Sequence, residues 1–192
     1  MNRSEQRIVA AARRVRGLCP SLEAEALCAA LDVSLLRTDL GMEADSIKGF
    51  LLRSNRCSTA VIKSALPPEL QRVILFHELG HAVLGHPQGQ VHTFMERYLY
   101  QSQVSSQENE ANFFAAELLL TDAETLEILS HVPFDQAAAS LRVPPEILDF
   151  KCRMLQKKGL MAYEDRLRAV TSDCLRRVCM EGGTECCQDR FI

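Results

Sequence analysis

Three residues capable of metal chemistry stand together in the run His77-Glu78-Leu79-Gly80-His81. Residues four apart on a helix share one face, with Cβ atoms about 5 to 6 Å apart. The two imidazoles can therefore converge on one zinc ion, which binds ring nitrogens at about 2.0 to 2.1 Å. Glu78 is offset by one residue, so its carboxylate is expected beside the metal, where a base can accept a proton from an attacking water. The pattern predicts a zinc hydrolase with His77 and His81 as ligands and Glu78 as the general base.

The residues around this pattern favour the metal interpretation over a chance match. Pro67-Pro68-Glu69 predicts a helix start, and the helix should run to about Gly85, where Pro87 prevents continuation. Apolar residues surround the motif on nearly all sides, which predicts a buried helix. Burying two histidines and a glutamate is costly unless hydrogen bonds or a metal compensate them. We also expect Gly80, which has no side chain, to mark the close approach of another element.

A third ligand is expected on the next buried-looking helix, from about Gln107 to Leu120. Catalytic zinc usually takes three protein ligands and keeps one position open. Glu108 and Asn112 fall on one stripe of this helix, which suits a ligating carboxylate followed one turn later by an amide that hydrogen-bonds a ligating histidine. Glu110, about one residue out of register, is the alternative ligand. Acidic residues at this position would also stabilise the helix start through its dipole.

The remaining histidines, His86, His92 and His131, are weaker ligand candidates. His86 lies outside the longer H-E-x-x-H-x-x-G-x-x-H pattern, because Leu84 and Pro87 stand where that pattern has glycine and histidine. A polar stretch over residues 87–107 is expected to border the site. Its Tyr98 and Tyr100, together with His92, are candidates for a second oxyanion donor.

The periodicity of apolar residues and the positions of turn residues predict that the chain contains both helices and strands. Ser21 is expected to cap the second of two N-terminal helices, and a turn-rich link predicts a hairpin between two strands. The expected helices cover residues 5–16, 22–31, 123–129, a pair between 133 and 158, and 161–178, and the expected strands cover 33–36, 49–52 and 59–62.

Composition excludes several other classes of protein. The 192 residues favour one compact domain, or one domain with a small appendage, and the net charge of −3 argues against a general nucleic-acid binder. The sequence has neither the run of about 18 apolar residues that spans a bilayer nor an apolar signal core, so a cytoplasmic location is expected. The spacing of the four tail cysteines fits no zinc ribbon, so we expect thiols in a flexible tail: Cys174, Cys179, Cys186 and Cys187.

The paired motifs resemble the ImmA/IrrE family of bacterial metallopeptidases. The resemblance rests on the run from Gln71 to His81, followed after a polar insert by Glu108-x-Glu110-Ala111-Asn112-x-Phe114-Ala115. It implies a zincin-like fold that holds Zn²⁺ on His77, His81 and Glu108, with Glu78 as the base. It also implies the substrate class, namely helix-turn-helix repressors of mobile elements or stress regulons.

These observations lead to a specific expectation for the whole chain. The fold class is α+β, with a zincin-like peptidase core over 1–130, in which a small antiparallel or mixed sheet packs on the H-E-x-x-H helix. A C-terminal helical appendage with helix-turn-helix rhythm follows over 131–178, then a cysteine-rich tail over 179–192. The expected function is zinc-dependent endopeptidase cleavage of a helix-turn-helix repressor. The alternative is a non-proteolytic regulatory module that binds a repressor or other partner with structural zinc.

Direct nucleic-acid binding and membrane contact are not expected. The segment with helix-turn-helix rhythm carries Pro144, Pro145, Glu146 and Asp149 at the start of its second helix, where a DNA-reading helix would have basic or amide residues.

Overall fold

The computed structural model describes residues 1–41, 47–54, 57–86 and 106–162 of the chain. Within them it has an α+β fold of seven helices and one three-stranded sheet. The helices are α1 Arg3–Leu18, α2 Ala24–Ala30, α3 Pro68–Leu84, α4 Ser106–Leu119, α5 Asp122–His131, α6 Phe134–Ser140 and α7 Pro145–Lys157, and the strands are β1 Val33–Thr38, β2 Gly49–Ser54 and β3 Cys57–Lys63.

Some of the expected features lie outside the described residues. They are most of the polar stretch over 87–107, with His92, Tyr98 and Tyr100, nearly all of the helix over 161–178, and the four tail cysteines.

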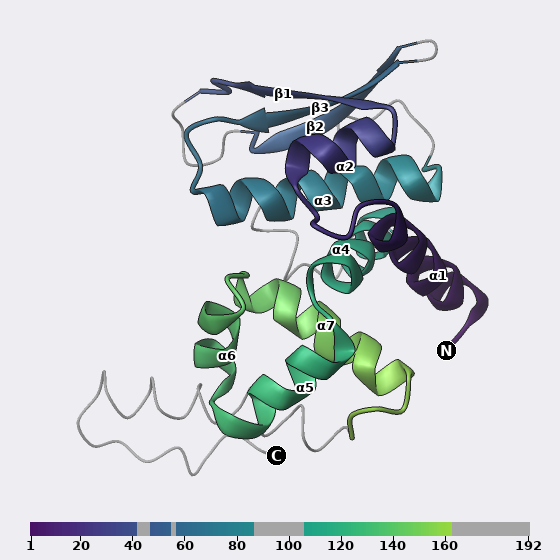
Figure 1. Ribbon diagram of the computed structural model, residues 1–192, viewed down its shortest axis with the longest axis vertical. Helices are drawn as coiled ribbons and strands as arrows, with labels where there is room; N and C mark the ends of the chain where they lie inside the picture. The colour runs from purple at the N-terminus through teal and green to yellow at the C-terminus, as the bar shows by residue number, and fades with distance from the viewer. Residues whose placement is uncertain (42–46, 55–56, 87–105, 163–192) are drawn as a thin grey trace, which may run out of the picture.

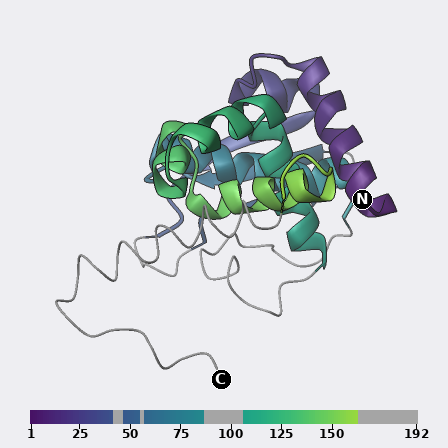
Figure 2. The ribbon, with the colours of Figure 1, turned by 90° about the horizontal axis from the view of Figure 1, so that it is seen from below.

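The helices lie in layers beneath the sheet, and α3 occupies the centre (Figure 1). One side of α3 packs on β2 and β3, and another side packs on α4. This position explains why α3 is apolar nearly all round, as ten of its residues are buried. In turn, α4 contacts α1 and α7. Seen from below, α5 and α7 lie on the side of the molecule away from the sheet (Figure 2).

The sheet is mixed, with strand order β1-β3-β2. β2 and β3 pair antiparallel, which confirms the expected hairpin, while β1 pairs parallel with β3. Gly49 begins β2 close against α3, because a Cβ at this position would lie 2.4 Å from Cγ2 of Ile74. The absence of a side chain at Gly49 therefore allows β2 to lie directly over the motif helix.

The start of α2 differs from the sequence prediction. Ser21 does not cap this helix: the helix begins at Ala24, and Glu23 occupies the N-cap position without a side-chain hydrogen bond. Between them, Leu22 has a φ of 53°, in the left-handed region, so the chain cannot continue as a helix from Ser21. The Ser21 hydroxyl instead accepts a hydrogen bond from the backbone N–H of Glu23, at 3.4 Å.

Arginine side chains bind the C-terminal ends of both helices that carry the motifs. Arg7 on α1 donates to the Leu84 carbonyl, and Arg53 on β2 donates to the Ala82 carbonyl at 2.8 Å. Arg16, also on α1, donates to the Leu118 carbonyl of α4. The last carbonyls of a helix have no partner within it, so a cation there supplies hydrogen bonds and complements the dipole. These contacts fix α3 and α4 relative to α1.

A buried ion-pair cluster joins α7 to the rest of the helices. Lys151 is 1% exposed and donates to Glu117 at 2.7 Å and to Asp122 at 2.6 Å. Lys158 binds the same two carboxylates. Both lysines therefore tie α7 and the residue after it to the end of α4 and the start of α5.

Of the helices in the described part of the chain, none combines the length and the apolar character that crossing a bilayer needs.

Candidate metal centre

Both histidines of the motif lie in the buried part of α3, on the side that faces α4. His77 is 1% exposed and His81 is 3% exposed. Their Nε2 atoms lie 3.1 Å apart, as expected for residues four apart on one helical face. The two rings therefore direct their outer nitrogens to the same small space.

Glu108 completes this cluster from the first turn of α4. Its Oε2 lies 3.1 Å from Nε2 of His77, and its Oε1 lies 3.4 Å from Nε2 of His81. Ligand atoms placed tetrahedrally at about 2.0 to 2.1 Å from zinc are about 3.3 Å from one another. The spacing of the three groups therefore matches what one zinc ion requires.

Gly80 allows α4 to come close enough for this contact. A Cβ at Gly80 would lie 3.1 Å from Cδ1 of Phe114 and 3.2 Å from both Cα and the carbonyl oxygen of Ala111. The backbone of α4 thus runs against the bare backbone of α3 one turn from Glu108. The expectation that Gly80 marks a close approach is confirmed.

Asn112 fixes the orientation of His77. Its Oδ1 lies 2.8 Å from Nδ1 of His77, and since an amide oxygen only accepts, the ring nitrogen donates. A neutral imidazole with the proton on Nδ1 has its lone pair on Nε2. Asn112 therefore favours the tautomer in which Nε2 of His77, the nitrogen that faces Glu108 and His81, can bind a metal.

Glu78 is fully buried beside the cluster, with 0% exposure. Neither of its carboxylate oxygens has a hydrogen bond of good geometry with any described residue. Burial raises the pKa of Glu78 to about 8, and the charge of Glu108 adds to the rise, while His77 and the backbone N–H of Leu51 on β2 oppose it. An unsatisfied buried carboxylate is costly, so a cation or a water held next to it would stabilise the site.

The charges of the three clustered groups depend strongly on one another. Burial lowers the pKa of His77, but the hydrogen bond with Glu108 and the charge of Glu78 outweigh it, so the pKa is raised overall. Burial raises the pKa of Glu108, but hydrogen bonds with His77 and His81 outweigh it and hold the pKa well below its usual range. A buried carboxylate, Glu78, and a half-buried one, Glu108, thus adjoin two basic rings, an arrangement that fits a divalent cation in the proton's place.

The other candidate ligands do not reach this cluster. Glu110, the alternative ligand, binds His86 at 3.1 Å and accepts a hydrogen bond from Ser4 at 2.5 Å. His131 is exposed on α5, where its Nδ1 lies 2.6 Å from the hydroxyl of Ser130. Among the described residues, the group that could hold a metal ion consists of His77, His81 and Glu108.

His86 has a place at the site that sequence reasoning missed. Its Nδ1 lies 2.9 Å from Nδ1 of His81, on the side of that ring opposite the cluster. The contact follows from the end of α3. Gly85 has a left-handed backbone (φ 67°), its N–H donates to the Ala82 carbonyl, and the N–H of His86 donates to the His81 carbonyl. This is a Schellman motif, which turns the second residue after a helix back against the last helical turn.

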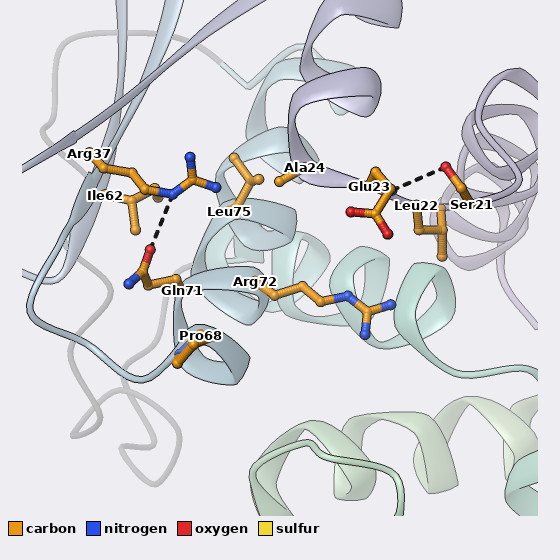
Figure 3. Close-up of a pocket in the computed structure, with 10 residues that line it drawn as sticks. All are labelled: Ser21, Leu22, Glu23, Ala24, Arg37, Ile62, Pro68, Gln71, Arg72 and Leu75. Atoms are coloured by element: carbon orange, nitrogen blue, oxygen red, sulfur yellow. Dashed lines mark hydrogen bonds between the residues drawn. The ribbon is translucent and has the colours of Figure 1, made fainter.

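A separate pocket of about 530 Å³ lies between the start of α2, the sheet and the first half of α3 (Figure 3). Arg37 crosses one end of it and donates to Gln71 at 3.2 Å and to Glu25 at 2.7 Å. None of the clustered metal-ligand candidates lines this pocket, so it is distinct from the site described above.

Comparison with known proteins agrees with these observations. Residues 28–153 match the family model of peptidase family M78, which is described as the IrrE N-terminal-like domain. The chain belongs to this family. The match includes both motif helices of the M78 domain and runs into α7, while α1 lies before it.

An immunity-region protein of a bacteriophage is also similar to this M78 chain. The two are 36% identical over 106 residues, and the relative is named uncharacterized immunity region protein 2 of Bacillus phage phi105. The aligned part is 55% of this chain and 65% of the relative, so the chain spans somewhat less than two thirds of the relative's length.

Proposed function

We propose that this M78 protein is a zinc-dependent endopeptidase with a zincin-like core. In this proposal His77, His81 and Glu108 hold the metal, and Glu78 is the general base. The observation that carries it is the convergence of three ligand-type atoms, at separations that suit one zinc ion, next to a buried carboxylate with no hydrogen bond of good geometry among the described residues. A site that only braced the fold would have no use for that carboxylate.

The chain's own residues would divide the reaction between them. Bound zinc supplies a Lewis acid that polarises a carbonyl oxygen and activates water for attack. Glu78 accepts the proton of the attacking water and passes it to the leaving amine. Burial raises the pKa of Glu78 above that of an exposed glutamate, which makes its carboxylate a stronger base. Asn112 keeps the lone pair of His77 on Nε2 throughout.

The edge of β2 is the proposed place for the peptide substrate. β2 lies at one side of the described sheet, and Leu51 at its centre interacts through its backbone N–H with Glu78. Arg53, two residues on, donates to α3 at the Ala82 carbonyl. An extended peptide added to this edge would run past Glu78, held by backbone hydrogen bonds.

A helix-turn-helix repressor is the proposed substrate. The ImmA/IrrE resemblance implies this class, and the similarity to a phage immunity-region protein supports a role in control of a mobile element. In this proposal the protein acts in the cytoplasm and cleaves a repressor that a neighbouring gene encodes.

The variant Glu78→Gln tests the proposal against the alternative of a non-proteolytic binding module. Glutamine keeps the size of the side chain but accepts no proton, so zinc content and folding should match wild type. Cleavage of a co-expressed helix-turn-helix repressor from the neighbouring gene, followed by immunoblotting, should stop. If the variant relieves repression as well as wild type does, binding without proteolysis explains the function instead.

A further inference from the structure

The geometry points to a second function for the end of α3: we propose that His86 and Glu110 form a positioning relay that holds His81 in the form that binds metal. The inference rests on the proposed metal site. It concerns residues outside the ligand set and includes Ser4, on a helix that precedes the family match.

The direction of each hydrogen bond in the relay follows from its outer end. The Glu110 carboxylate only accepts, so Nε2 of His86, 3.1 Å away, must carry a proton. The other ring nitrogen of His86, Nδ1, lies 2.9 Å from Nδ1 of His81, so one of these two nitrogens donates and the other accepts. A neutral ring protonated at Nε2 has its lone pair on Nδ1. His86 therefore accepts the hydrogen bond that joins it to His81.

The result for His81 is a defined tautomer. Because Nδ1 of His86 accepts, Nδ1 of His81 donates across the 2.9 Å contact. The lone pair of His81 then lies on Nε2, the atom that faces Glu108 and His77. In the other neutral tautomer, an N–H would point at the metal position and block coordination. His86 thus does for His81 what Asn112 does for His77.

The outer end of the relay is itself held in place by two elements. Ser4 on α1 donates to Oε1 of Glu110 at 2.5 Å, while His86 binds Oε2. Both oxygens of Glu110 therefore have a hydrogen-bond donor, and the carboxylate is held as the acceptor for Nε2 of His86. Arg7, one turn after Ser4, binds the Leu84 carbonyl near His86. The N-terminal helix α1 therefore contacts the relay on the side of His81 that faces away from the clustered ligand atoms.

Zinc affinity of the purified full chain tests the relay without any need for a substrate. His86→Leu removes the acceptor for His81 and should weaken zinc binding by about 10- to 100-fold in a competition titration with a chromogenic chelator. His86→Gln should recover most of the affinity, because its amide oxygen can accept from His81 while its amide nitrogen donates to Glu110. His131→Leu, which removes an exposed histidine, is the matched control and should bind zinc as wild type does.

A second measurement separates positioning from a general loss of structure. In zinc-loaded wild type with ¹⁵N-labelled histidine, NMR should show His81 protonated at Nδ1, with slow exchange of that proton. Ser4→Ala, a smaller change, should keep the fold and speed this exchange. Unchanged affinity in a folded His86→Leu protein, or a His81 ring coordinated through Nδ1, would overturn the relay. If wild type itself bound no zinc, both the relay and the proposed function would be wrong.

Discussion

Adding one methyl group at Gly80 tests how closely α3 and α4 must approach. In Gly80→Ala the new Cβ would lie 3.1 to 3.2 Å from Phe114 and from the backbone of Ala111, so neighbouring atoms must move by a few tenths of an ångström. The Phe114 ring can rotate slightly, but the Ala111 backbone can move only with α4 as a whole. The shift should therefore reach Glu108, one turn away on the same helix.

The expected stability change is the sum of two opposing effects. Alanine is favoured over glycine inside a helix by about 1 kcal/mol. Overpacking of a tight core contact costs about 1 to 3 kcal/mol. The net change in the free energy of unfolding should be a loss of about 0 to 2 kcal/mol. Zinc affinity should fall as well, because the ligand separations depend on the position of α4.

Gly17→Ala is the matched control. Gly17 lies in the last turn of α1 and is exposed, and a Cβ added there would meet no atom within 4 Å. The free energy of unfolding of Gly17→Ala should rise by about 0.5 to 1 kcal/mol, since only the preference of alanine over glycine in a helix applies. The stability of both variants is measured by urea unfolding without metal. The zinc affinity of both is measured by titration with a chelator. If Gly80→Ala gained as much stability as Gly17→Ala and bound zinc like wild type, the close-approach argument would be refuted.

Three further predictions concern residues around the site and in the helical layer. Asn112→Ala removes the acceptor for Nδ1 of His77 and should weaken zinc binding by about 10- to 100-fold in the same titration. Lys151→Met removes the buried lysine while Lys158 still binds both carboxylates, and it should lower the free energy of unfolding by about 1 to 3 kcal/mol, measured in urea. Burial raises the pKa of Asp122, but hydrogen bonds from Lys151 and Lys158 outweigh it and the pKa is lowered, so the ionised carboxyl stabilises the fold above its ordinary pKa of 3.8. Asp122→Asn should therefore be less stable than wild type at neutral pH, and the difference should narrow as the pH falls below that value.

The motif helix and its partner could be predicted from the sequence because their signals are local. The spacing of His77 and His81, the prolines before them and the apolar residues around them all act within a few turns of helix. The stripe that joins Glu108 to Asn112 is also local, and the structure places both residues against the histidines. Periodicity on one helix determines which side chains point the same way, so these assignments did not require the tertiary structure.

The relay could not be found in the same way, because it depends on three elements that meet only in the folded chain. His86 follows the helix, Glu110 lies on α4 and Ser4 lies on α1. One local signal was present: Gly85 at the end of an apolar helix predicts a Schellman turn, which would have placed His86 against His81. Similarly, the left-handed backbone at Leu22 is not predictable, since leucine rarely adopts it, and the sequence therefore predicts a start of α2 that is too early.

Anomalous diffraction at the zinc absorption edge, from crystals of protein purified with zinc, tests the central claim most directly. A single strong peak should lie about 2.0 to 2.2 Å from Nε2 of His77, Nε2 of His81 and one carboxylate oxygen of Glu108. A peak bound by the histidines without Glu108, or protein that takes up no zinc at these residues, would contradict it.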